Sequence, residues 1–111
     1  MARSKLTELD LARQIRDAAR ALGWRHIHFR PAMTSKGYRT PFSGDAGFPD
    51  MVLARRGRVI FAELKRDGEH PRSEQLAWLE AIDPADELER VGPEAYVWHP
   101  SDFERIVELL R

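Results

Sequence analysis

Residues 47–68, GFPDMVLARRGRVIFAELKRDG, consist of two apolar runs on either side of a short basic turn. Two such runs joined by a short turn that contains glycine predict a β-hairpin. If Arg56 and Gly57 form the turn, Asp50 in the first strand lies directly opposite Glu63 in the second strand. The hairpin therefore predicts two carboxylates that face each other at the open end of the most hydrophobic stretch of the chain.

Two opposed carboxylates beside apolar surface need a compensating positive charge. Directly opposite side chains have Cβ atoms about 5 Å apart, and like charges at that distance repel. Strand alternation places Lys65 on the same side as Glu63, where it can neutralise one acid. A divalent cation can neutralise both acids, and oxygen ligands without His or Cys suit Mg²⁺ or Mn²⁺. The pattern leaves three interpretations open: a metal site, an Asp–Lys–Glu cluster without a metal, and a hairpin in another register.

The composition is that of one ordinary globular domain. With 111 residues, of which 42% are apolar and 32% charged, the chain can bury a core without disulfides. The lack of cysteine excludes a disulfide framework, a thiolate nucleophile and a zinc–thiolate site. No apolar run reaches membrane-spanning length, and the first residues lack the apolar core of a signal peptide. We therefore predict a single cytoplasmic domain over residues 1–111, with no membrane contact.

The net charge of zero hides a strong segregation of charge along the chain. Residues 1–66 contain 14 Lys and Arg against 6 Asp and Glu, whereas residues 67–111 contain 4 against 12. The first part therefore carries a formal charge of +8 and the second part −8. This segregation is consistent with a basic face that binds a polyanion, and equally with pairing between the two parts of the chain.

Residue periodicity predicts a mixed sheet flanked by helices. The predicted segments are a helix between Thr7 and Gly23, strands over 25–30, 50–54, 59–65 and 95–99, a helix capped by Ser73 that ends before Pro84, and a helix opened by Ser101 and Glu104. Residues 31–47 show no period and are predicted to form a long loop. The strand over 59–65 is apolar on both faces, and a helix separates it from the last strand. This arrangement indicates a central strand with a parallel neighbour, and an α/β fold in the order α-β-β-β-α-β-α.

The hairpin residues also carry a resemblance to a known family. Gly-Phe-Pro-Asp at 47–50, followed by strand, turn and strand and then by Glu-Leu-Lys at 63–65, resembles the PD-(D/E)xK nuclease signature. With Gln75 early in the next helix, the set is similar to the VRR-NUC family. These are small nuclease domains found alone in phages and bacteria, or fused to larger repair proteins. The resemblance spans residues 7 to 100 and implies a restriction-endonuclease-like core.

The resemblance implies a role for each residue of the hairpin site. Asp50 and Glu63 would ligate Mg²⁺ or Mn²⁺, and the backbone carbonyl of Leu64 would complete the protein ligands. Lys65 would position the attacking water or help to deprotonate it. This set of roles corresponds to the metal-site interpretation of the two opposed acids.

Two further residues enter the site through the resemblance. Gln75 matches the glutamine of the family that lies near the metal, and its alternative role is that of an exposed residue at a helix start. Glu8 matches the acid that the family carries on its opening helix, with Asp10 as the competing candidate. Both acids fit equally well as first-turn residues that stabilise the helix dipole.

Basic residues near the motif are candidates for contacts with DNA. Three of them precede the motif, together with the aromatic residues Tyr38 and Phe42: Arg30, Lys36 and Arg39. Three others lie at the hairpin tip: Arg55, Arg56 and Arg58. Basic residues interleaved with aromatic ones suit a backbone clamp on nucleic acid. At ~3.3 Å per residue the tip lies roughly 17 Å from Asp50, so it is expected to contact phosphates away from the cleaved bond.

The sequence therefore predicts a metal-dependent DNA endonuclease that hydrolyses phosphodiester bonds. Without a base-reading motif, recognition is expected to depend on DNA structure, such as a junction, flap or end, in the repair or recombination of phage or bacterial DNA. A chain this short covers little DNA, and we expect a homodimer. The alternatives are a non-catalytic nucleic-acid-binding module with the same fold and a protein-interaction domain.

Overall fold

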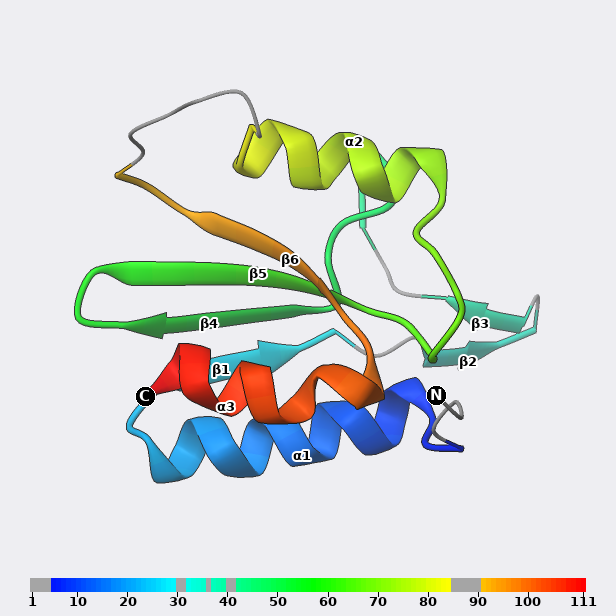
Figure 1. Ribbon diagram of the computed structural model, residues 1–111. Helices are drawn as coiled ribbons and strands as arrows, with labels where there is room; N and C mark the ends of the chain where they lie inside the picture. The colour runs from blue at the N-terminus through cyan, green and yellow to red at the C-terminus, as the bar shows by residue number, and fades with distance from the viewer. Residues whose placement is uncertain (1–4, 30–31, 36, 40–41, 85–90) are drawn as a thin grey trace.

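The computed structural model of the chain describes residues 5–29, 32–35, 37–39, 42–84 and 91–111. Its main body is a four-stranded sheet with helices on both faces, and a two-stranded ribbon lies outside this body (Figure 1). The elements in chain order are α1 (Glu8–Ala21), β1 (Arg25–His28), β2 (Ala32–Thr34), β3 (Gly37–Arg39), β4 (Met51–Arg55), β5 (Arg58–Leu64), α2 (Ser73–Ile82), β6 (Glu94–Trp98), the short 3₁₀ helix η1 (Pro100–Asp102) and α3 (Phe103–Leu110). None of the helices in these ranges is long and apolar enough to cross a membrane.

The main sheet has the strand order β1-β4-β5-β6. β1 pairs antiparallel with β4 and β4 pairs antiparallel with β5, whereas β5 and β6 are parallel. Parallel neighbours need a crossover, and α2 provides it between β5 and β6. The predicted α/β fold, a mixed sheet with helices in the order α-β-β-β-α-β-α, is confirmed for the main body.

The β4–β5 hairpin has the predicted register. Its turn consists of Arg56, with φ of 50°, and Gly57, with φ of 81°. Left-handed backbone at both central positions is the geometry of a two-residue hairpin turn that follows the twist of the strands. The ladder extends from this turn to the pair of Met51 and Ala62. The next residues outward are the two acids of the predicted site, which therefore leave the hairpin opposite each other.

The two faces of the sheet differ in how they are covered. α1 and α3 pack side by side on one face, and α2 lies over β5 and β6 on the other (Figure 1). Ile60, Ala62 and Leu64 of β5 are buried in the core under α1 and α3. Because side chains alternate along a strand, Phe61 and Glu63 point to the face that α2 covers. The carboxylate is thus placed under α2, away from the main hydrophobic core.

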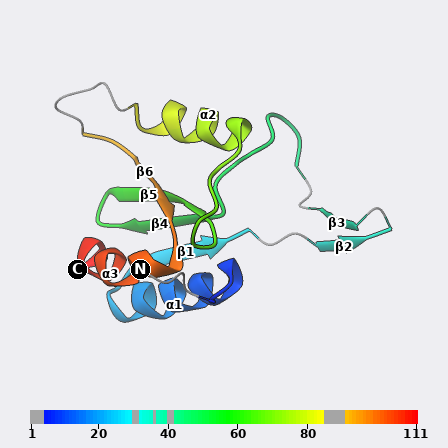
Figure 2. The same cartoon turned by 45° about the vertical axis from the view of Figure 1, so that its right-hand side comes forward.

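The predicted long loop over residues 31–47 contains a ribbon, which corrects that prediction. β2 and β3 pair antiparallel, from Ala32 opposite Arg39 to Thr34 opposite Gly37. Figure 2 shows this ribbon projecting away from the main sheet. Strands of three residues are too short for a two-residue alternation to stand out, so periodicity alone could not reveal them.

The start of the last helix also differs from the prediction. α3 begins at Phe103, after η1, and the carboxylate of Asp102 accepts a hydrogen bond from the His99 N–H at 2.9 Å. The predicted cap, Ser101, instead donates from its N–H and its hydroxyl to Asp67, at 3.1 and 2.9 Å. A contact with a loop 34 residues away therefore replaces the local cap.

Candidate active site

Asp50 is fixed just before β4 by its backbone and by its side chain. Its carbonyl oxygen accepts a hydrogen bond from the Phe29 N–H at 2.8 Å. Its carboxylate oxygen Oδ2 accepts one from the Leu64 N–H at 2.8 Å, across the open end of the hairpin. The structure therefore places Asp50 beside Leu64, as the predicted ligand set requires, while a role for the Leu64 carbonyl stays a prediction.

Glu63 is a buried carboxylate with unequal surroundings at its two oxygens. The residue is 2% exposed. Its Oε1 accepts a hydrogen bond from Gln75 Nε2 at 2.9 Å and lies 3.9 Å from Lys65 Nζ. Its Oε2 is shielded from solvent and has no hydrogen-bond partner among the residues that the structure describes. A buried acceptor without a donor is energetically unfavourable, so this oxygen is the position at which a cation would be most stabilising.

The surroundings raise the pKa of Glu63 from its ordinary value of 4.5 to about 8. Burial is the largest cause, because it disfavours the charged form. The negative charge of Asp50 and the hydrogen bond that a protonated Glu63 can share with Asp50 raise it further, whereas Lys65 opposes the shift. Lys65 therefore compensates only part of the negative charge of the two acids, and a proton on Glu63 or a bound cation would compensate the rest.

Gln75 is placed by the first turn of α2. It is 7% exposed, and its Oε1 accepts a hydrogen bond from the Arg72 N–H at 2.8 Å, which leaves Nε2 to donate to Glu63. Arg72, and not the predicted Ser73, is the N-cap residue of α2. The structure brings Gln75 into the site, whereas the alternative of an exposed residue at a helix start is wrong.

Gly47 lets the motif approach α2 closely. Its φ is 96°, and a Cβ atom added there would lie 2.7 Å from the carbonyl carbon of Glu74. A side chain at this position would therefore collide with the backbone of α2 just before Gln75. The glycine of the motif is explained by this contact as well as by its left-handed backbone.

The two candidate acids in the first turn of α1, Glu8 and Asp10, have different surroundings. Thr7 and Asp10 cap the helix reciprocally, because the Thr7 N–H donates to Asp10 Oδ2 at 2.9 Å and the Asp10 N–H donates to Thr7 Oγ1 at 3.1 Å. These hydrogen bonds lower the pKa of Asp10. The pKa of Glu8 is raised overall. Partial burial is the largest cause, the negative charge of Asp50 adds to the increase, and the positive charge of Lys65 opposes it. Glu8 is thus within electrostatic reach of the hairpin site, whereas Asp10 serves the helix cap.

Contacts that the sequence did not reveal hold the loop after Lys65. The Lys65 N–H donates to the carbonyl oxygen of Trp98 at 3.0 Å. Further along this loop, Asp67 accepts the two hydrogen bonds from Ser101, and the Glu69 carbonyl oxygen lies 2.8 Å from a ring nitrogen of His99. No local pattern could have found these contacts, because they join segments that are 30 or more residues apart.

The arginines at the hairpin tip are largely engaged in structural contacts. Arg58 donates to both carboxylate oxygens of Glu94 and to the Leu109 carbonyl at 3.0 Å. Arg55 donates to the Leu22 carbonyl at 2.9 Å, and its guanidinium lies 4.6 Å from the centre of the Trp24 ring.

A surface cavity of about 780 Å³ lies at this tip, at the opposite end of the hairpin from the acids. It is bordered by five arginines: Arg25, Arg55, Arg56, Arg58 and Arg111. Arg56 is exposed in the turn.

The predicted basic residues of the long loop are only partly covered by the structure. Arg30 and Lys36 lie outside the described residues, and Arg39 ends β3. Their proposed contact with DNA therefore stays a prediction.

The donor set suits a hard divalent cation. Two carboxylates supply oxygen ligands and negative charge, and one carboxylate oxygen is buried without a partner. In the part of the chain that the structure describes, no group of three or more His, Cys, Asp or Glu side chains is arranged to hold a metal ion. The ligand set that the resemblance implies, Asp50, Glu63 and the Leu64 carbonyl, contains only two such side chains and stays a prediction.

The comparisons with known proteins add no relative to this picture. A scan against protein-family models finds no match, and a search of the curated proteins finds none either.

Proposed function

We propose that the chain is a metal-dependent DNA endonuclease of the PD-(D/E)xK type, similar to the VRR-NUC family. One observation carries the proposal: Glu63 is a buried carboxylate beside Asp50, with an unpartnered oxygen and a raised pKa. A buried acid of this kind is weak evidence of a stabilising role, because apolar residues of similar volume are often at least as stable there. Perturbed carboxylates that converge with a lysine are characteristic of functional sites.

Each residue of the site has a role in phosphodiester hydrolysis. Asp50 and Glu63 would hold Mg²⁺ or Mn²⁺, with the Leu64 carbonyl as a further ligand. A bound cation of this kind supplies the positive charge that stabilises the phosphate in the transition state and activates water for attack. Lys65, which is near Glu63 Oε1, would orient the attacking water and stabilise developing negative charge.

Two residues act on the acids and not on the phosphate. Gln75 holds Glu63 Oε1, which leaves Oε2 for the cation. Because Gln75 is itself fixed by the Arg72 N–H, it restricts the rotamer of Glu63 before any ligand binds. Glu8 adds a negative charge near Lys65 and Asp50, where it would assist in placing a cation or a water molecule.

The proposal extends to the substrate and the assembly. We infer a branched or otherwise structured DNA substrate and a homodimer in a bacterial or phage-infected cytoplasm. The basic residues of the ribbon segment support a nucleic-acid substrate.

The test is cleavage of a panel of DNA substrates by the purified chain. Linear duplex, fork, flap and four-way junction are incubated with Mg²⁺, with Mn²⁺ and with EDTA. We expect cleavage that requires the divalent ion and that prefers one of the structured substrates. Binding to the same DNA without cleavage would contradict the proposal and favour the non-catalytic binding module.

A further inference from the structure

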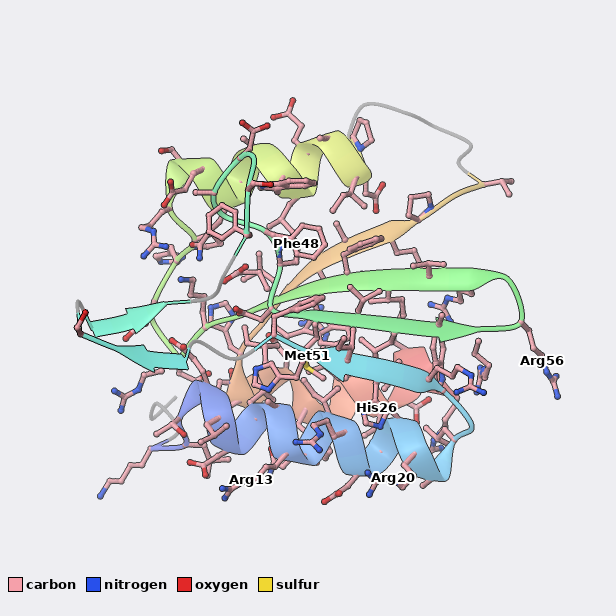
Figure 3. All side chains as sticks on the ribbon, turned by 180° about the vertical axis from the view of Figure 1, so that it is seen from behind. Arg13, Arg20, His26, Phe48, Met51 and Arg56 are labelled. Carbon is pink, nitrogen blue, oxygen red and sulfur yellow. The ribbon has the colours of Figure 1, made fainter. Side chains whose placement is uncertain are left out.

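α1 carries a row of three arginines that the hairpin site does not use. Arg13, Arg16 and Arg20, here called the arginine row, are spaced by three and four residues and therefore lie on one side of the helix. At ~1.5 Å per residue the row is about 10 Å long. Figure 3 shows Arg13 and Arg20 along α1, with His26 of β1 beside the same helix.

The positive charge of the row is poorly compensated. Within the described ranges, none of its three guanidinium groups forms an ion pair, and Asp17 is the one acid among residues 13–20. The nearby Asp10 is engaged in the helix cap with Thr7, and its electrostatic interaction with Arg13 compensates part of the charge of the row. Three arginines elsewhere each have an acidic partner: Arg72 with Glu74, Arg105 with Asp102 and Arg111 with Glu108. The arginine row differs from these three residues, because its three members follow one another along a single helix face without such an ion pair among the described residues.

The field of the row extends to the neighbouring strand. The pKa of His26 is lowered by burial and then by the positive charges of Arg20 and Arg16. β1 is one of the two edge strands of the main sheet, and α1 contacts it, so His26 lies near the row. The positively charged form of His26 is thus disfavoured beside the row, as expected near a positive electrostatic potential.

The row begins close to the candidate site. Glu8, at the start of the same helix, is within electrostatic reach of Asp50 and Lys65. Arg13 follows five residues later, about 7–8 Å along the helix axis. The arginine row therefore extends away from the acids along the helix that starts beside them.

We propose that the arginine row of α1 binds the phosphate backbone of the DNA next to the cleaved bond. This proposal rests on the proposed function, because the distance from the site matters only if the site acts on DNA. A row about 10 Å long matches about three nucleotides of one strand, at 3.4 Å of axial rise each. Arginine suits this role because its guanidinium group can bind two phosphate oxygens at once.

The experiment compares two triple variants with the same change in charge. In the row variant Arg13, Arg16 and Arg20 are replaced by Gln, and in the matched control Lys5, Arg105 and Arg111, which lie outside the candidate site, are replaced by Gln. Binding of labelled duplex and junction DNA is measured by fluorescence anisotropy in EDTA, so that cleavage does not interfere. Salt is varied from about 50 to 200 mM, the range over which phosphate contacts are most visible.

We expect the row variant to bind about 10- to 100-fold more weakly at the lowest salt. The plot of the logarithm of the association constant against the logarithm of salt concentration has a negative slope. The magnitude of this slope should decrease by about 2 to 3, since each phosphate contact contributes about 0.9. The control should keep the wild-type slope. A wild-type slope in the row variant, or an equal loss in the control, would overturn the proposal.

Two further measurements keep the result interpretable. Thermal unfolding checks that the row variant folds, which is expected because Gln is a good helix former. A second row variant with Lys at the three positions retains the charge and should keep most of the salt dependence. If wild-type DNA cleavage is absent but the row variant loses binding, the nuclease proposal fails and the row stands. If cleavage is present and the row variant binds like wild type, the row alone fails.

Discussion

The two ends of the β4–β5 hairpin both hold like charges face to face, but the rest of the fold treats them differently. At the tip, Arg55 is paired directly with Arg58. At the open end, Asp50 is the residue opposite Glu63, one step beyond the last ladder pair. The same strand geometry thus creates two unfavourable pairs, one basic and one acidic.

The basic pair is compensated by groups from elsewhere in the chain. Arg58 has the carboxylate of Glu94, and Arg55 has the Leu22 carbonyl and the face of Trp24. These partners are at the ends of α1, β1 and β6, so the arginines also tie those elements to the hairpin. The tip is therefore a structural junction.

The acidic pair is left short of positive charge. Lys65 is 3.9 Å from Glu63 Oε1, Gln75 donates one neutral hydrogen bond, and Oε2 has no partner among the described residues. The comparison teaches that opposed like charges do not by themselves mark a site. The absence of compensation from the surrounding fold distinguishes the open end from the tip.

The largest expected effect is on the rate of DNA cleavage. Lys65→Ala should reduce the single-turnover rate by about 10²–10⁴-fold, because it removes the ammonium group that would orient the attacking water. Folding should persist, since Glu63 can take up a proton when Lys65 is absent. Arg56→Ala at the exposed tip removes the same charge and should leave the rate nearly unchanged. Cleavage by Lys65→Ala at the wild-type rate would show that the open end is no more catalytic than the tip.

The next effect is on stability as a function of pH. Glu63 has a pKa of about 8 in the folded chain against an ordinary value of 4.5, so between these values the folded state holds a proton that the unfolded state has released. The free energy of unfolding should therefore fall as pH rises from about 4.5 to about 8 in metal-free buffer. Glu63→Gln should remove this dependence and be more stable at pH 8, by on the order of 2–5 kcal/mol.

Denaturant titrations in EDTA at several pH values measure this difference. Mn²⁺ should raise the melting temperature of the wild-type chain at pH 8 more than that of Glu63→Gln, because the ion replaces the proton. A wild-type stability that stays constant from pH 5 to pH 8 would show that the acidic pair is compensated after all.

A smaller effect, on the free energy of unfolding, is expected from adding a side chain at Gly47, the glycine of the motif. Gly47→Ala should lower the free energy of unfolding by about 2–4 kcal/mol, because the added Cβ meets the backbone of α2 and the residue has a positive φ. Gly57→Ala at the tip is the matched change, since φ there is 81° and nothing lies within 4 Å of the added Cβ. It should lose only about 1 kcal/mol through backbone strain. Equal losses in the two variants, measured by urea unfolding, would contradict the close approach of α2.

The smallest effect concerns the ion pair at the tip. Glu94→Gln should lower the free energy of unfolding by about 1 kcal/mol at neutral pH, because the pair with Arg58 is partly exposed. The hydrogen bonds from Arg58 lower the pKa of Glu94, so its contribution is present above pH 4.5 and is lost as pH falls. The tip therefore has the opposite pH sign to the open end. A stability of Glu94→Gln equal to wild type at both pH 7 and pH 3 would remove this contrast.

Much of the fold could be predicted because its signals are local. The cap at Thr7, the two-residue turn and the alternation of β5 each depend on residues within a few positions of one another. The ribbon of β2 and β3 could not be predicted, because its strands are too short to show a period. The cap at Ser101 was predicted wrongly, because Asp67 binds that serine from a distant loop.

The candidate site likewise has features that local sequence predicts and features that depend on the tertiary structure. The sequence by itself determined that Asp50, Glu63 and Lys65 leave one end of the hairpin together, since the turn and the two-residue repeat of a strand set that register. Only the tertiary structure decided that Gln75 supports Glu63, that Asp10 caps α1 while the charges of Asp50 and Lys65 act on Glu8, and that the tip arginines are compensated. The physical reason is that compensation of a charge depends on which distant segments pack beside it, and no local pattern encodes that.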